Sequence, residues 1–405
     1  MTEIKTISEA PVIYCKVSDS PVFAISVCIK CGSRDEKENE HGLTHFFEHM
    51  IFKGTKKRNA EDISSEIEAL GGELDAFTTR DNLCITCKVP YVGFKKSLDV
   101  VFDMLLNSVF REKDIQLEKQ VVKEELRMAK ENHDDSGDEL FMSLVYPERE
   151  LGRSILGDEK SIDSFTRKQL FTYAKTRVCG KNLIVSGVGK IDEEKFFALV
   201  KGYLQDIETN GCVPSDNSQP FAFFDKRVKR DGMDGVNLYL GFKTFPANHK
   251  DRFALSILNN ILGDGMSSRL FLRIREEAGL AYSISSFPLY HRNEGMLYIF
   301  GSTSKGKENE LKNRVIEECL SLGNTIQEEE FEKAKGQLIG NLSMGLETSL
   351  SKSMFNARNY GVYQKIHTYE QIVELIEQVD FFKVKKLAEE ILIKDNFSVL
   401  LFGNV

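Results

Sequence analysis

Residues 41–55, HGLTHFFEHMIFKGT, place two histidines and a glutamate within about one turn of a predicted helix. His45 and His49 are four residues apart and share a helix face, so both imidazoles can reach one metal ion. Glu48 lies close enough to contact a water molecule on that ion. A catalytic zinc ion takes three protein ligands and one water, whose pKa it lowers, while a carboxylate accepts the proton. The pattern therefore indicates metal-assisted hydrolysis with Glu48 as general base.

The same segment carries an apolar stripe, formed by Leu43, Phe46, Phe47 and Met50. This spacing is typical of the buried face of an amphipathic helix. The helix is therefore expected to bury one face and to present both histidines on another. The alternative interpretation is an ordinary core helix whose paired histidines take no part in chemistry.

A third ligand must come from another segment, and the stretch LEKQVVKEELRMAKEN offers Glu118, Glu124, Glu125 and Glu131. Glu118 and Glu125 are seven residues apart and share a helix face, whereas Glu124 points about 100° away from Glu125. Any one of these glutamates, taken alone, is more often a solvated charge on a helix surface. Spacing alone leaves the choice of the third ligand open.

The elements that would position these residues can be placed from local patterns. A compact helix is predicted after the histidine motif, with Asn59 as its N-cap and Gly71 just beyond its end. Residues 74–90 are expected to be extended, with a turn near Arg80–Asn82. A longer helical pattern at 114–133 carries the four glutamates.

The order of elements restarts after residues 207–220, a predicted linker rich in Asn, Ser, Pro and Gly. The segments IEALGGELDAFTT and IREEAGLAYSISS share a helix–glycine–strand plan, one on each side of the linker. NLIVSGVG and NFSVLLFGNV close the two parts, with Asn182 and Asn396 at matching places. We therefore expect an α+β fold of two similar domains, 1–206 and 221–405, related as an internal duplication. Each is expected to hold an antiparallel-rich sheet packed by helices.

Composition excludes some partners of this 405-residue chain. The formal net charge is −8 with no basic stripe, so nucleic acid is not expected as a partner. No apolar run approaches the roughly 18 residues of a membrane span. The first residues lack the features of a signal or transit peptide, which favours a cytoplasmic location.

The eight cysteines are scattered, mostly through apolar, strand-like stretches. We expect buried free thiols in a reducing compartment. Two CxxC pairs, Cys28 with Cys31 and Cys84 with Cys87, raise the alternative of a structural zinc site. In a strand, however, the two cysteines of each pair would face opposite sides.

The histidine segment resembles the inverted zinc motif, HxxEH, of the pitrilysin, insulin-degrading enzyme and mitochondrial processing peptidase family. The stretches GGELDAFTT, VVKEELRM, LGRSILG and GMSSRLFLRIREEAGLAYSI resemble that family too, so the resemblance covers nearly the whole chain. It implies a zinc metalloendopeptidase in which His45 and His49 bind one Zn²⁺ per chain and Glu48 is the general base. The third ligand falls 76 residues after His49, at Glu125, and Glu118 supports the site.

The resemblance also implies residues that contact a peptide substrate. Arg275 and Tyr282, in REEAGLAYS, would contact it near the scissile bond. The peptide would lie extended along Asp75, Ala76 and Phe77 in the stretch LDAFTT. The family commonly has Asn where this chain has Asp75, so that contact is a departure.

The family's chamber needs four α+β domains, so the resemblance implies a homodimer acting on peptides or unfolded presequence-like segments. The chain lacks the long glycine-rich loop of the non-catalytic mitochondrial processing subunit. The alternative is a catalytically silent structural or peptide-binding subunit of the same fold.

Overall fold

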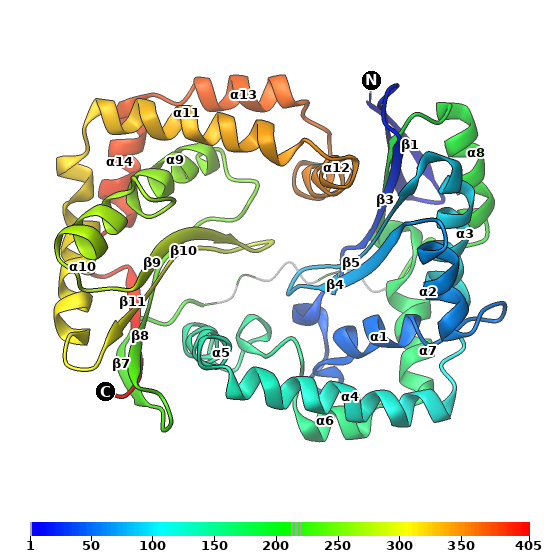
Figure 1. Cartoon of the computed structure of the whole chain (residues 1–405), viewed down its shortest axis with the longest axis horizontal. Helices are drawn as coiled ribbons and strands as arrows, with labels where there is room; N and C mark the ends of the chain where they lie inside the picture. Colours follow the sequence, from blue (N-terminus) through cyan, green and yellow to red (C-terminus); the bar gives the residue numbers. More distant parts are fainter. Residues whose placement is uncertain (1, 212–213, 215–217, 219) are drawn as a thin grey trace. The chain divides into compact units, whose positions relative to one another are not determined.

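The computed structural model describes residues 2–211, 214, 218 and 220–405. The chain divides into two compact units (Figure 1). The first unit comprises Met1–Met128, Arg153–Ser215 and Gly345–Ile366, and the second comprises Ala129–Gly152, Asp216–Met344 and His367–Val405. Each unit thus includes a segment from the other half of the sequence. The predicted linker includes residues outside those described, among them Cys212, and it stays a prediction.

The first unit is built on a six-stranded sheet in the order β1-β2-β6-β3-β5-β4. Its strands are β1 (Thr2–Ile7), β2 (Ala10–Lys16), β3 (Val22–Ile29), β4 (Glu73–Thr78), β5 (Leu83–Pro90) and β6 (Leu183–Gly189). Only the β2–β6 pair is parallel, and all other neighbours are antiparallel. Strand β4 lies at the edge of the sheet and pairs with β5 on one side.

Helices cover both faces of this sheet. They are α1 (Leu43–Ile51), α2 (Ala60–Glu68), α3 (Phe94–Asn107), α4 (Glu112–Glu131), α6 (Glu159–Ser164), α7 (Arg167–Arg177), α8 (Glu193–Leu204) and α12 (Ser349–Tyr363), with α4 reaching the unit boundary. The predicted apolar stripe of α1 is confirmed, because its four side chains are at most 1% exposed in the main core. Short 3-10 turns of this unit lie at Ser33–Asp35, Glu38–Glu40, Tyr91–Gly93 and Gly180–Asn182, and the second unit has one at Glu150–Gly152.

The local predictions around α2 and β4 are confirmed. The Asn59 side chain accepts a hydrogen bond from the backbone N–H of Asp62, as an N-cap should. Gly71 has φ +71°, the left-handed conformation that glycine adopts at little cost. The extended stretch turns between β4 and β5, as predicted.

The second unit holds a five-stranded sheet in the order β7-β11-β8-β10-β9. Its strands are β7 (Asp225–Lys229), β8 (Gly235–Thr244), β9 (Ser283–Tyr290), β10 (Gly295–Ser304) and β11 (Phe397–Gly403). Its helices are α5 (His133–Val145), α9 (Arg252–Leu262), a π-helix (Leu270–Glu277), α10 (Glu308–Thr325), α11 (Glu328–Gly345), α13 (Tyr369–Glu377) and α14 (Phe381–Ile391), with α11 ending at the unit boundary.

The two sheets share one topology, which confirms the predicted fold class and supports the duplication. If β1 is set aside, both sheets run first–fifth–second–fourth–third in chain order, and in both only the first and fifth strands are parallel. The matched asparagines make matched bonds. The Asn182 amide donates to the carbonyl of Arg177 at the end of α7, and the Asn396 amide donates to the carbonyl of Ile391 at the end of α14.

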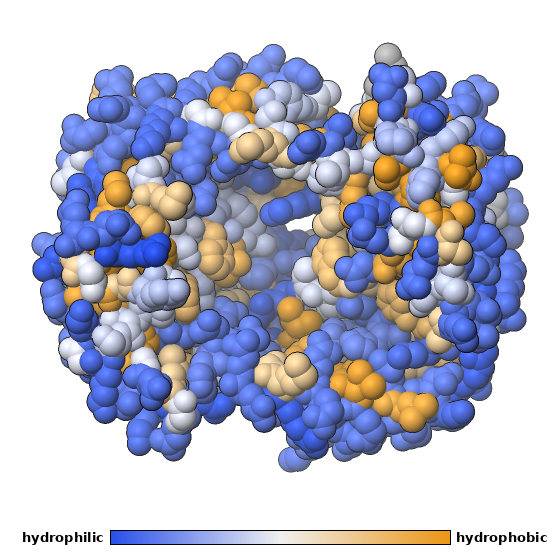
Figure 2. All heavy atoms as spheres, viewed as in Figure 1, coloured by the Kyte–Doolittle hydropathy of each residue, from blue (hydrophilic) through white to orange (hydrophobic). Residues whose placement is uncertain are grey.

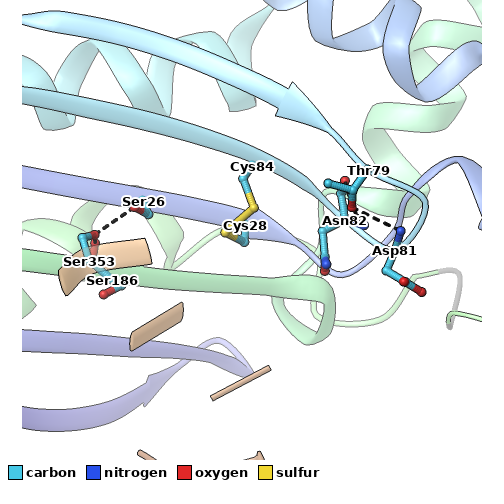
Figure 3. The surroundings of a disulfide bond; sticks show 8 residues. All are labelled: Ser26, Cys28, Thr79, Asp81, Asn82, Cys84, Ser186 and Ser353. Atoms are coloured by element: carbon cyan, nitrogen blue, oxygen red, sulfur yellow. Dashed lines mark hydrogen bonds between the residues drawn. A yellow bond between two sulfur atoms is a disulfide. The ribbon is translucent and has the colours of Figure 1, made fainter. Parts of the chain in front are cut away.

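The cysteine expectation needs one correction. Cys28 and Cys84 are directly opposed on β3 and β5, with 4.1 Å between their Cα atoms, and form a disulfide (Figure 3). This pairing joins the first cysteine of each CxxC, because strand alternation separates the two members of one motif. It leaves no thiolate at those two positions for a structural zinc site. The other described cysteines include buried thiols, and burial raises the pKa of Cys87 to about 12.

Helix α12 covers the face of the first sheet that carries Cys28. The Ser353 hydroxyl donates to Ser26 Oγ at 2.9 Å and lies 2.7 Å from the carbonyl oxygen of Ser186, so α12 is tied to β3 and β6 (Figure 3). All three serine side chains are fully buried.

None of the described helices is long and apolar enough to cross a bilayer. The face drawn in Figure 2 is largely hydrophilic, with hydrophobic side chains in separate small groups.

Candidate metal centre

Three side chains of the first unit place possible metal-ligand atoms close together. His45 and His49 project from α1, and Glu125 projects from α4. The distance from His45 Nε2 to Glu125 Oε1 is 3.6 Å, and that from His49 Nε2 to Glu125 Oε2 is 3.4 Å. One ligand atom of each residue lies within 4.8 Å of the other two.

These distances fit a zinc ion. With zinc–ligand bonds of about 2.0–2.2 Å and tetrahedral angles, neighbouring ligand atoms should be about 3.4 Å apart. Two imidazole nitrogens and one carboxylate oxygen form a donor set that zinc prefers, and a zinc ion held by these three residues would keep a fourth position for water. Burial, and then the nearby charge of His49, hold the pKa of His45 below its usual range. The ring is therefore neutral, which is the ligating form.

Glu118 contacts one of the two histidines of the candidate centre. It is 3% exposed, and its Oε1 lies 2.8 Å from His49 Nδ1, while its Oε2 pairs with Lys53 Nζ at 2.6 Å. Burial alone would raise the pKa of Glu118, but the bonds from His49 and Lys53 outweigh it and lower that pKa. An ionised Glu118 can accept a proton from Nδ1, which would leave Nε2 of His49 as the atom available to a metal ion.

The structure distinguishes between the glutamates that spacing alone left as possible third ligands. Glu118 and Glu125 both face the histidines, as the shared-face argument favours. Glu124 is exposed and pairs with Arg127 on its own helix instead. Glu131 is also exposed, at the end of α4. Three-dimensional position thus leaves Glu125 as the carboxylate beside both imidazoles.

Glu48 lies on α1 next to His49 and contacts the edge strand of the sheet. Its Oε2 accepts a hydrogen bond of 2.5 Å from the Thr78 hydroxyl at the end of β4. Burial raises the pKa of Glu48, and the Thr78 bond offsets part of that rise. A carboxylate with a raised pKa is a better proton acceptor than an exposed one.

Thr78 was not among the predicted site residues. The signal was present, since it follows Phe77 in the stretch already singled out, but no spacing rule connects it with Glu48.

The residues predicted to bind substrate lie on β4. Asp75 is exposed, and its Oδ1 accepts a hydrogen bond from the backbone N–H of Ala76 at 2.9 Å. Strand alternation puts Asp75 and Phe77 on one face of the sheet and Ala76 with Thr78 on the other. The three residues therefore lie on the same edge strand, but their side chains do not all point to the same face of the sheet.

Arg275 and Tyr282 lie in the second unit. Arg275 is near the end of the π-helix, with its guanidinium 4.6 Å from the ring of Phe271 and its Nε 3.9 Å from Glu276. Tyr282 immediately precedes β9 and is 85% exposed. Both carry polar groups that are accessible for contact with another molecule.

Comparison with known proteins identifies the family of the chain. The family model described as insulinase (peptidase family M16) matches residues 12–159, and the model described as peptidase M16 inactive domain matches residues 164–338. The chain belongs to peptidase family M16.

Among its relatives is YmxG of Bacillus subtilis, named an uncharacterized zinc protease. It is 33% identical over 373 residues, 92% of this chain and 91% of that protein. An uncharacterized zinc protease of Rickettsia felis is 31% identical over 385 residues, 94% of this chain and 92% of that protein.

Two solved structures share the fold of this chain. A protease from Helicobacter pylori has a TM-score of 0.92 at 22% identity, over 99% of both chains. A peptidase M16 inactive domain from Pseudomonas fluorescens has a TM-score of 0.90 at 19% identity, over 100% of this chain and 98% of that one.

Proposed function

We propose that the protein is a zinc-dependent endopeptidase that hydrolyses peptide bonds in peptides or unfolded, presequence-like segments. The observation that carries this proposal is the cluster of His45, His49 and Glu125, in which one possible ligand atom of each residue lies within 4.8 Å of the other two and both imidazoles lie 3.4–3.6 Å from the carboxylate. Glu48 stands beside that cluster on the same helix. The relatives named as zinc proteases support the same reaction class.

Zinc, when bound, would lower the pKa of water and polarise a carbonyl group. Glu48 takes the proton from the attacking water and passes it to the leaving amine. Glu118 holds the ring of His49 in one tautomer throughout. Arg275 and Tyr282 supply N–H and O–H donors for the substrate carbonyl, where negative charge develops.

The substrate is proposed to bind as an extra strand. The outer edge of β4 is unpaired within the sheet, so its backbone groups can hydrogen-bond an extended peptide. Asp75, Ala76 and Phe77 would then contact alternate side chains of that peptide.

We propose one zinc ion per chain and a homodimer. Each chain carries one His–His–Glu cluster and one Arg275–Tyr282 pair, so two copies would supply the four α+β domains that the family resemblance implies. A cytoplasmic location stays a prediction.

The deciding experiment compares the parent protein with Glu48→Gln, using zinc analysis and a quenched-fluorescent peptide library. We expect near-stoichiometric zinc in both proteins and turnover only in the parent. Glu61→Gln, an exposed glutamate on α2, is the matched control and should keep full turnover. Turnover by Glu48→Gln, or absence of zinc from the parent, would overturn the proposal. A zinc-loaded parent that binds peptides without cleaving them would support the silent-subunit alternative.

A further inference from the structure

The hydrogen bond between Thr78 and Glu48 links the edge strand of the first sheet with the helix that carries the candidate base. Thr78 is the last residue of β4, and its hydroxyl donates to Oε2 of Glu48 across 30 residues of sequence. We propose that Thr78 is a positioning residue for Glu48: it holds one carboxylate oxygen so that the other, Oε1, faces the reacting water. This inference rests on the proposed peptidase function.

A glutamate side chain needs such a restraint. It has three rotatable bonds, and a general base must come within hydrogen-bond distance of the proton that it abstracts. The hydroxyl of Thr78 restricts those rotations by fixing one end of the carboxylate.

The position of Thr78 is itself fixed by the turn that follows it. The Thr79 hydroxyl accepts hydrogen bonds from the backbone N–H groups of Asp81 and Asn82, at 3.3 and 2.9 Å (Figure 3). The backbone N–H of Thr79 donates in turn to the carbonyl of Asn82 at 2.7 Å. The end of β4 is therefore closed by a tight, fully hydrogen-bonded turn.

A second segment holds this turn from outside. The backbone N–H groups of Ser33 and Arg34 donate to the carbonyls of Thr79 and Arg80, at 3.1 and 3.0 Å. At Gly32, a Cβ atom would lie 2.4 Å from the Arg80 carbonyl oxygen, so glycine is required for the two backbones to approach this closely.

The same segment also holds the start of α1. Two residues beyond Arg34, the buried carboxylate of Glu36 accepts hydrogen bonds from the backbone N–H groups of Gly42 and Thr44, at 2.8 and 2.6 Å. Residues 32–36 thus contact both the turn after Thr78 and the N-terminus of the helix that carries Glu48. Thr78 and Glu48 are therefore connected through residues 32–36 as well as through their own hydrogen bond.

This arrangement has a consequence for substrate binding. A peptide that pairs with the outer edge of β4 would order the strand that ends at Thr78. Any shift of that strand moves the hydroxyl relative to Glu48. We therefore expect Thr78 to affect the chemical step more than the binding of the peptide.

The test uses Thr78→Val, which keeps the shape of the side chain and removes the hydroxyl, and Thr78→Ser, which restores it. We expect Thr78→Val to lower kcat by about 10-fold to 100-fold, a size typical of a misplaced catalytic group. KM should change less than about twofold and zinc content should not change. Thr78→Ser should recover most of the lost kcat.

Binding is measured separately in the Glu48→Gln background, where a fluorescent peptide is not cleaved. Adding Thr78→Val there should leave the peptide Kd unchanged. Thr86→Val is the matched control, because Thr86 lies on β5 and faces the opposite side of the sheet by alternation. It should keep the parent kcat.

Three results would overturn the proposal: parent-level kcat in Thr78→Val, a weaker peptide Kd with unchanged kcat, or no recovery in Thr78→Ser. If Thr78→Val fails to fold, Thr78→Ala against Thr78→Ser gives the same comparison. Failure of the peptidase function itself would appear differently, as turnover that persists in Glu48→Gln.

Discussion

Apart from β1, the two sheets have the same strand order. The helices that follow the second strand of this shared order, β3 in one sheet and β8 in the other, differ in the polar groups that they carry. Helix α1, after β3, carries His45, Glu48 and His49. Helix α9, after β8, has the sequence RFALSILNNIL, with no histidine, cysteine or acidic residue. One topology is therefore used twice, and of these two helices only α1 offers candidate metal ligands.

The comparison extends to the link between helix and edge strand. In the first sheet the Thr78 hydroxyl on β4 donates to the carboxylate of Glu48 on α1. In the second, the Ser286 hydroxyl on β9 donates to the amide oxygen of Asn259 on α9, at 2.8 Å. An amide can accept that hydrogen bond but cannot take up a proton at neutral pH. The same connection is thus purely structural where the acceptor is an amide, and available for acid–base chemistry where it is a carboxylate.

The largest effect is expected when one of the candidate metal ligands on helix α1 is removed. His49→Ala should lose zinc and reduce turnover to background, since only one imidazole and one carboxylate remain. Asn259→Ala, on the helix without ligands, should keep its zinc. Metal analysis after dialysis against a weak chelator gives the answer, and stoichiometric zinc in His49→Ala would contradict the assignment.

The second prediction tests what the second unit, through Arg275, contributes to catalysis. Arg275→Ala should lower kcat/KM by about 100-fold, which is the effect of losing one donor to a developing oxyanion, while zinc content stays constant. Arg273→Ala is the control on the same π-helix, because Arg273 pairs with Glu318. Equal kinetics in the two variants would show that Arg275 has no special role.

A smaller loss is expected at the residue that orients His49. Glu118→Gln should weaken zinc affinity by about 10-fold to 100-fold, because the amide accepts the imidazole proton less strongly. Glu124→Gln, six residues further along α4 and paired with Arg127, should leave the affinity unchanged. Competition with a chromogenic chelator measures both, and equal affinities would place Glu118 outside the metal centre.

The smallest effect concerns how the start of helix α1 responds to pH. Burial raises the pKa of Glu36 from 4.5 to about 8, although backbone N–H groups at the helix start oppose this. Its contribution to stability is therefore fully present below about pH 4.5 and is lost as the pH rises through 8. Urea midpoints between pH 5 and 9 should fall more steeply for the parent than for Glu36→Gln. The exposed Glu38→Gln should follow the parent, and parallel curves for all three proteins would refute the prediction.

Local sequence rules were sufficient for part of this molecule. The cap at Asn59, the glycine at 71 and the turn after β4 each depend on a few neighbouring residues. Side-chain spacing on a single helix also separated Glu118 and Glu125 from Glu124. These features follow from geometry within one element, so the sequence contains them directly.

Other features depend on contacts between distant segments, and spacing could not predict them. The Thr78–Glu48 bond joins a strand to a helix, and the carboxyl group of Glu36 bonds to the backbone at the start of α1. The Cys28–Cys84 disulfide follows from strand register. A helix was expected before the glycine of REEAGLAYS, but periodicity does not distinguish the observed π-helix, Leu270–Glu277, from an α-helix over so short a segment.

Helix α12 affects how the chain can be synthesised and assembled. It belongs to the first compact unit, where Ser353 completes the buried serine cluster on β3 and β6, yet it ends only at Tyr363 of 405 residues. Because a ribosome releases the chain from its N-terminus onward, the first sheet is made long before the helix that covers one of its faces. The first unit can therefore reach its final packing only after Tyr363 has been made, and a fragment that stops before α12 would leave that face open to water.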